Sequence, residues 1–158
     1  MMKKAILFIG FILFGAGIFA QEYKTAIGLR GGVTQGITLK HFTSGTSAFD
    51  FIFGTYKRGV HLVLLYEIHA HNVFDVPNLS LFYGPGGHFG HFNHSNIRHW
   101  GDYENDVIAI GVDFVLGVEY TFDEIPINIG IDIKPAFNII PAIRYWQGGA
   151  LFLRYTIR

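Results

Sequence analysis

The chain has 158 residues, with 12 basic and 12 acidic side chains, no net formal charge and no cysteine. The absence of cysteine excludes disulfide bonds, thiolate metal sites, a cysteine nucleophile and a lipid-modified cysteine anchor. No stretch is basic enough to form a nucleic-acid footprint, so nucleic acid is not expected as a partner.

The first 20 residues have the layout of a secretory signal peptide. Lys3 and Lys4 form a positive start, Ala5–Phe19 is apolar, and Ala20 is a small residue before the polar chain begins. The apolar run is shorter than the ~20 residues that a helical membrane span needs. We therefore expect residues 1–20 to be a cleaved signal peptide and 21–158 to be the mature domain; a retained membrane helix is the alternative.

The mature region contains eight segments with strand patterning, separated by residues typical of turns. In chain order they are Lys24–Arg30, Ile37–Phe42, Ala48–Tyr56, Val60–Asn72, Leu79–Phe89, Val107–Phe122, Ile127–Phe137 and Ala150–Ile157. Two longer loops are predicted at His91–Asn105 and Asn138–Gly149, and the other connections are short. An even strand count with short turns on one side and longer loops on the other is typical of an outer-membrane barrel.

The sixth segment has the clearest two-residue alternation. Large apolar residues from Ile108 to Tyr120 occupy one face, whereas the other face carries small or charged residues such as Gly111, Asp113 and Glu119. The fourth and seventh segments repeat this pattern. It predicts an all-β fold, an eight-stranded antiparallel up-and-down transmembrane β-barrel whose apolar face contacts lipid. A soluble lipocalin-like barrel is the alternative fold.

Charged residues within the predicted strands fall almost without exception on the face opposite the apolar one. The set expected to form a lumenal charge network consists of Arg30, Lys40, Asp50, Glu67, Asp113, Glu119, Asp132, Lys134 and Arg154. An eight-stranded barrel is just wide enough inside to be filled by its own side chains. Since buried charges are costly unless they are paired, we expect these residues to form a cross-linked plug rather than a pore.

Histidines suggest one candidate metal site. His88, His91 and His94 are spaced three residues apart near the predicted barrel mouth, and imidazole is a common ligand of divalent metals. No carboxylate lies within this cluster. We therefore expect no bound metal and no cofactor, and these three histidines are the weak candidates.

A catalytic alternative uses His94 as base, Ser95 as nucleophile and Glu104 as the orienting acid. Outer-membrane lipid A deacylases are eight-stranded barrels with a His, one intervening residue and then Ser-Asn, and His94-Ser95-Asn96 is similar to that motif in part. It departs from it because His94 and Ser95 are adjacent, which on a strand places them on opposite faces. The main prediction is that the chain is not an enzyme.

The whole mature chain resembles the small eight-stranded bacterial outer-membrane β-barrel proteins, the OmpX/OmpA-like group, in particular its compact uncharacterised members. The resemblance is carried by the leader and by five short motifs: Ile27–Arg30, Gly111–Asp113, Leu116–Tyr120, Asp132–Pro135 and Leu153–Arg158. It implies this barrel fold and a location in the bacterial outer membrane. Family members usually end in an aromatic residue, whereas this chain ends in Arg158, with Tyr155 nearby.

These observations together predict a monomeric, non-enzymatic integral outer-membrane barrel with a filled lumen. Its expected role is structural or surface interaction, through the loops His91–Asn105 and Asn138–Gly149. The expected partners are outer-membrane lipid and, during biogenesis, the outer-membrane assembly machinery. A lipid-modifying enzyme and a small porin-like channel or transporter remain the functional alternatives.

Overall fold

The computed structural model describes residues 23–56, 59–92, 106–140 and 144–157, so the predicted signal peptide lies outside the described residues. The strands are β1 (Thr25–Gly32), β2 (Gln35–Phe42), β3 (Ser47–Tyr56), β4 (Gly59–Ala70), β5 (Leu79–Phe92), β6 (Val107–Thr121), β7 (Ile127–Ile140) and β8 (Arg144–Ile157). A short 3₁₀ helix, η1 (Val73–Asp75), lies between β4 and β5. No helix in this part of the chain is long and apolar enough to cross a membrane.

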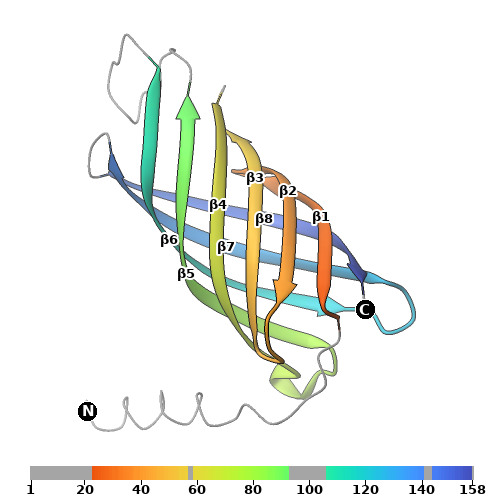
Figure 1. Ribbon diagram of the computed structural model, residues 1–158. Coiled ribbons are helices and arrows are strands. Elements are labelled where there is room, and N and C mark those ends of the chain that lie inside the picture. Colours follow the sequence, from red (N-terminus) through yellow and green to blue (C-terminus); the bar gives the residue numbers. More distant parts are fainter. Residues whose placement is uncertain (1–22, 57–58, 93–105, 141–143, 158) are drawn as a thin grey trace, which may run out of the picture.

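The eight strands form one closed antiparallel barrel in which each strand pairs with its neighbours in sequence (Figure 1). Closure is made by β1 and β8, which pair from Thr25 with Ile157 to Gly32 with Ala150. The fold predicted from the alternation is therefore confirmed. A closed barrel has no edge strand with unpaired backbone N–H and C=O groups. Closure matters because lipid could not form hydrogen bonds with such groups.

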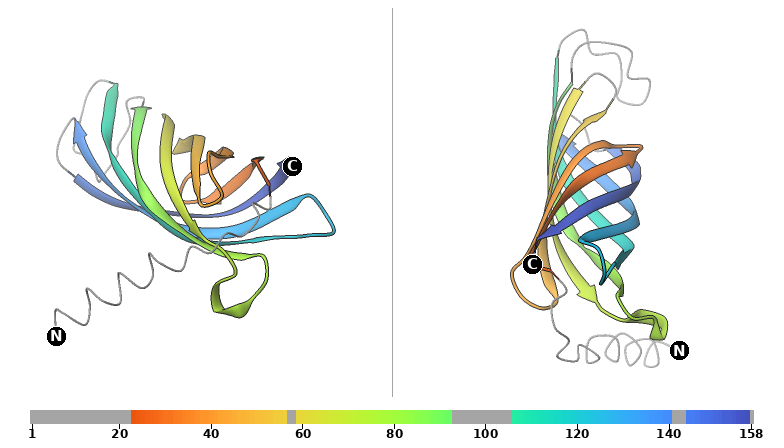
Figure 2. Two further views of the ribbon diagram at one scale, coloured as in Figure 1. Left: turned by 60° about the horizontal axis from the view of Figure 1, so that its bottom comes forward. Right: turned by 90° about the vertical axis from the view of Figure 1, so that its right-hand side faces the viewer.

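The barrel has two distinct ends, which we name by their connections. At the turn end β1 begins and β8 ends, and residues 43–46, 71–78 and 122–126 connect the strand pairs. At the loop end the connections are residues 33–34, 57–58, 93–106 and 141–143. Strands β5 and β6 rise together to the loop end, and η1 lies at the turn end (Figures 1 and 2).

Two predicted boundaries are wrong. Asn138–Gly149 is not a longer loop but part of the β7–β8 hairpin, because β7 continues to Ile140 and β8 starts at Arg144, with Asn138 paired to Arg144. Likewise β5 continues to Phe92, so His91 belongs to a strand rather than to a loop. The glycine and proline residues near these positions resemble turn signals, but the neighbouring strand supplies backbone partners that keep them in the sheet.

Burial alternates along every strand, and the apolar side chains lie outside. The inward positions of β6 are buried from Val107 to Thr121, whereas the outward positions from Ile108 to Leu116 are exposed. The outer wall includes Leu29, which is 67% exposed, and many other large apolar side chains. A soluble protein would bury these residues, so this inverted arrangement is that of a barrel surrounded by hydrocarbon.

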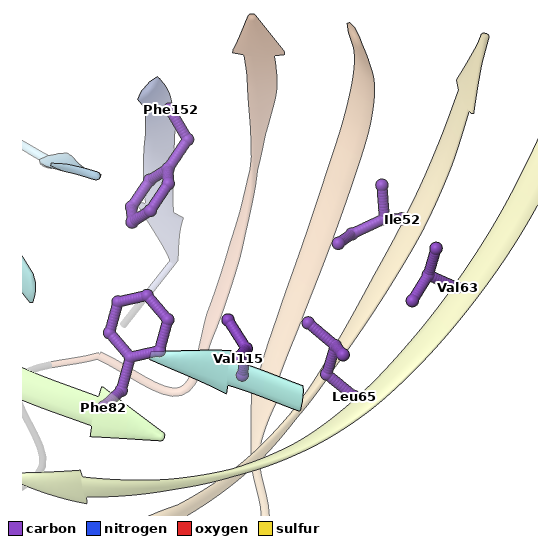
Figure 3. Packing of buried hydrophobic residues seen from close by; sticks show 6 residues of the cluster. All are labelled: Ile52, Val63, Leu65, Phe82, Val115 and Phe152. Atoms are coloured by element: carbon purple, nitrogen blue, oxygen red, sulfur yellow. The ribbon is translucent and has the colours of Figure 1, made fainter. Parts of the chain in front are cut away.

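A smaller apolar cluster lies inside the barrel. Six side chains from five strands point toward a common interior (Figure 3): Ile52, Val63, Leu65, Phe82, Val115 and Phe152. The rings of Phe82 and Phe152 are 6.0 Å apart between centroids. Room for the Phe82 ring depends on Gly117, because a Cβ there would lie 2.7 Å from the Ile131 carbonyl oxygen and would also strike the ring. A larger residue at position 117 would therefore collide with this interior packing.

Candidate functional site

The predicted lumenal charges all lie inside the barrel. All nine, from Arg30 in β1 to Arg154 in β8, are buried, and Lys40, Glu67, Asp113 and Lys134 have no exposed surface. Their positions follow from strand geometry, since successive side chains point to opposite faces of the sheet. Four bases and five acids thus meet in one narrow interior.

The larger of two ionic networks joins five strands. Lys40 Nζ of β2 lies 2.7 Å from Glu67 Oε2 of β4 and 2.8 Å from Glu119 Oε2 of β6. Arg154 of β8 contacts the same Glu119 oxygen at 3.2 Å and reaches Asp50 Oδ2 of β3 at 2.7 Å. The chain of contacts therefore ties strands from opposite sides of the barrel to one another.

Neighbouring polar and aromatic groups hold this network in place. Arg154 Nε donates to the Thr38 hydroxyl at 3.2 Å, and the Arg154 guanidinium carbon lies 3.8 Å from the centroid of the Phe152 ring. Lys40 Nζ lies 4.3 Å from the centroid of Phe82. A cation packed on an aromatic face is stabilised by the ring's negative quadrupole, so the apolar cluster and the charges support each other.

A second network lies among β5, β6 and β7. Lys134 Nζ contacts Asp113 Oδ1 at 2.7 Å, and His88 Nδ1 donates to Asp113 Oδ2 at 2.9 Å. The other ring nitrogen of His88 is 2.8 Å from the side-chain oxygen of Asn138. Separately, Arg30 of β1 donates to both carboxylate oxygens of Asp132 of β7, at 3.0 and 3.1 Å.

Several partners in these networks are not among the nine predicted lumenal charges. The Tyr23 hydroxyl donates to Glu119 Oε1 at 3.0 Å, although Tyr23 precedes β1. His69 Nε2 is 3.1 Å from Glu67 Oε2, and Asn128 donates to Thr121 at 3.0 Å. For Asn128 and Thr121 the alternation was an available signal, because both occupy inward positions of their strands. Nothing local marks Tyr23 as an inward residue.

The network is suited to holding a barrel shut. Each buried ion loses several kcal/mol of hydration, and that loss is offset only where geometry and additional hydrogen bonds are good. Here contacts between 2.7 and 3.2 Å bridge strands that are far apart in sequence. The chemistry is that of electrostatic cross-links.

The candidate metal ligands are not brought together. His88 points into the lumen and is buried, whereas His91, three residues further along β5, lies on the outward side and is 3.5 Å from Asp106. An odd spacing on a strand places two side chains on opposite faces, so they do not share a ligand sphere. His94 lies outside the described residues. Among the residues that are described, no three His, Cys, Asp or Glu side chains are grouped to hold a metal ion.

The catalytic alternative cannot be located in the fold. His94, Ser95 and Glu104 all fall within residues 93–105, between β5 and β6, and lie outside the described residues. The described residues next to this segment include His91 and Asp106.

Comparison with known proteins gives one structural likeness. No family model matches the chain, and no curated protein matches its sequence. The crystal structure of the N-terminal β-barrel domain of Pseudomonas aeruginosa OprF is similar, with a TM-score of 0.62 over 82% of this chain and 93% of that domain. The two sequences are 12% identical over this match, so the likeness concerns the fold. This chain therefore has the eight-stranded barrel fold that the resemblance to small outer-membrane barrels implied.

Proposed function

We propose that the chain is an integral protein of a bacterial outer membrane, with a side-chain-filled lumen and a structural or surface-interaction role without catalysis. One observation carries the proposal: the barrel is apolar outside, while its charges are buried and paired inside. Lipid is the surrounding in which that distribution is stable. The likeness to the OprF barrel domain supports the same membrane.

The side chains at the turn end support membrane insertion. Tyr66, Tyr83, Tyr120 and Tyr155 belong to β4, β5, β6 and β8 and occupy outward positions near this end. Phe49 also contacts Tyr66 there, at 5.3 Å between ring centroids. Tyrosine is enriched at membrane–water interfaces because its ring is apolar and its hydroxyl is hydrated. These four tyrosines would then mark one interface of the bilayer.

The surface role is assigned to the connection between β5 and β6. Residues 93–106 form the longest segment between two strands, whereas only residues 141–143 remain between β7 and β8. Longer connections lie on the outside of outer-membrane barrels. We expect a monomer in contact with outer-membrane lipid, delivered by the outer-membrane assembly machinery.

Membrane fractionation combined with a heat-modifiability gel tests the proposal. The full chain, expressed in a bacterium with two membranes, should sediment with outer membranes and change its gel mobility after boiling, as a closed barrel does when it unfolds. A mature protein that stays monomeric in buffer without detergent would contradict it. Identical lipid A mass spectra with and without expression of the chain are expected for a barrel without lipid-modifying activity.

The orientation can be tested with a short epitope tag at two matched positions. A tag between Asn96 and Ile97, in the β5–β6 connection, should be labelled on intact cells. A tag between Ser44 and Gly45, in a turn-end connection, should be labelled only after the outer membrane is permeabilised. The opposite pattern would invert the barrel and remove the basis for the surface role.

A further inference from the structure

The outer wall is not uniformly convex but carries an apolar groove. The groove has a volume of about 710 Å³ and is lined by 13 residues from five adjacent strands, β2 to β6. Its sides are outward side chains that include Phe51, Phe53, Leu62, Leu64, Phe89 and Ile110. Phe51 lies at the middle of β3, and the other five positions lie in the halves of their strands nearer the loop end.

The depth of the groove comes from one position. Across the wall the outward row runs from Phe51 through Leu64 and Gly87 to Val112, and the next row runs from Phe53 through Leu62 and Phe89 to Ile110. Seven of these eight positions carry a large apolar side chain and Gly87 carries none. The missing side chain exposes the wall between its neighbours.

Packing of the barrel constrains this position less than it constrains the inward glycines. A Cβ on Gly87 would have one neighbour within 4 Å, the Gly111 carbonyl oxygen at 3.3 Å, and would project into the groove. The inward Gly117 differs, since a Cβ there would strike both the Phe82 ring and the Ile131 backbone. Glycine within a strand costs about 0.5–1 kcal/mol relative to alanine. Within the chain, glycine at position 87 avoids one close contact, that with the Gly111 carbonyl oxygen.

We infer that the groove binds the acyl chain of a membrane lipid from the leaflet at the loop end. This inference rests on the membrane location proposed above. The groove belongs to the same apolar wall that faces hydrocarbon, and its sides offer no charged or hydrogen-bonding side chain to select a headgroup. The His88 side chain, which would be such a group, turns into the lumen toward Asp113.

The dimensions favour a single chain over a second copy of the protein. A volume of this size falls within the range of small-molecule sites, about 300–1,000 Å³. A stable protein interface uses roughly 20–30 residues on each side, more than the 13 that line the groove.

Native mass spectrometry of the full mature protein, released from nanodiscs of palmitoyl-oleoyl phosphatidylcholine, tests this site. The wild type should retain one phospholipid. Gly87→Phe should lose it, because the new ring fills the groove. The matched control is Gly31→Phe, another outward glycine, where a Cβ has nothing within 4 Å and which is not part of the groove. This control should retain the lipid.

Folding of each variant is checked by its heat-modifiable gel mobility before the lipid is counted. A folded wild type without retained lipid, or equal retention in the wild type and Gly87→Phe, would overturn the site while leaving the membrane barrel intact. A dimer that Gly87→Phe dissociates would overturn it in favour of a second copy. Failure of the wild type to insert would instead contradict the proposed function.

Discussion

Arg154 connects several groups of the larger lumenal network. Its guanidinium contacts Asp50 and Glu119, donates to Thr38 and stacks on Phe152, so it connects β8 with β2, β3 and β6. Glu119 also pairs with Lys40, whereas the only ion pair of Asp50 within the described lumen is with Arg154. Loss of the arginine therefore leaves Asp50 as the uncompensated charge.

Replacing Arg154 with Met should lower the free energy of unfolding by about 3–5 kcal/mol, the usual cost of breaking a buried ion pair from one side. Urea unfolding in lipid vesicles, followed by tryptophan fluorescence, measures this loss. Lys24→Met is the control, since Lys24 is exposed and its removal should change stability by no more than about 0.5 kcal/mol. Equal effects of the two changes would contradict a stabilising role for the network.

The ion pair of Arg30 and Asp132 can be used to separate the energy of charge pairing from the cost of burying a charge. Both charges can be removed together, because each residue is the other's ion-pair partner. Arg30→Met alone should destabilise the barrel by about 3–5 kcal/mol, since it leaves a buried carboxylate. Adding Asp132→Leu should recover most of that loss, because no charge then remains to be desolvated. If the double variant were as unstable as Arg30→Met in the same unfolding assay, the ion pair would stabilise the barrel by more than the cancelling of two buried charges.

For single residues, the sequence predicted which face of the barrel wall a side chain occupies, but not which other side chain it contacts. Period-two alternation predicted that Lys40, Glu67, Glu119 and Arg154 share the interior, because strand geometry alone decides which face a side chain occupies. Which acid meets which base depends on the stagger of the strands around the barrel. For the same reason His69 could be placed on the inner face, but not against Glu67.

The strands differ in how well their limits could be predicted from the sequence. The burial of β6 alternates over its whole length, and its predicted and observed limits differ by one residue. The start of β8 was missed because Arg144–Gly149 contains two glycines and a glutamine, which resemble a loop. In the barrel this segment lies in register with β7, from Asn138 opposite Arg144 to Ile133 opposite Gly149. Backbone pairing between strands can thus hold a segment that its own side chains would not define.

The depth of each strand in the bilayer can be tested by moving a charge along the outer wall. Phe114 lies near the middle of β6 and faces outward, so Phe114→Arg should cost about 2–4 kcal/mol in unfolding free energy. Ile157, the last residue of β8, is equally exposed but lies at the turn end, so Ile157→Arg should cost about 0–1 kcal/mol. Both are measured by urea unfolding from vesicles. Similar costs at the two sites would contradict a hydrocarbon layer centred on Phe114.

For the whole molecule, the fold class followed from the sequence because a closed barrel in lipid needs the same pattern eight times over. Apolar residues must alternate with polar ones in every strand, since each strand separates hydrocarbon from the interior. The groove at Gly87 did not follow, because a glycine in a strand is consistent with a kink, a close approach or an opening. Only the positions of Leu64, Val112 and Gly111 around it distinguish these three.

The filled lumen leads to a prediction about transport. Between the two ends, the described interior contains the Phe82–Phe152 contact and the ion pairs of Lys40 and Arg154, which connect opposite walls. An ion crossing this region would have to displace paired charges from a space that side chains already fill. We therefore expect the wild type to give no stable conductance steps in planar bilayers.

Phe152→Ala removes a ring that covers Arg154 and should raise the frequency of openings, provided that its heat-modifiable mobility shows a folded barrel. Stable steps from the wild type would contradict a closed lumen and favour the channel alternative.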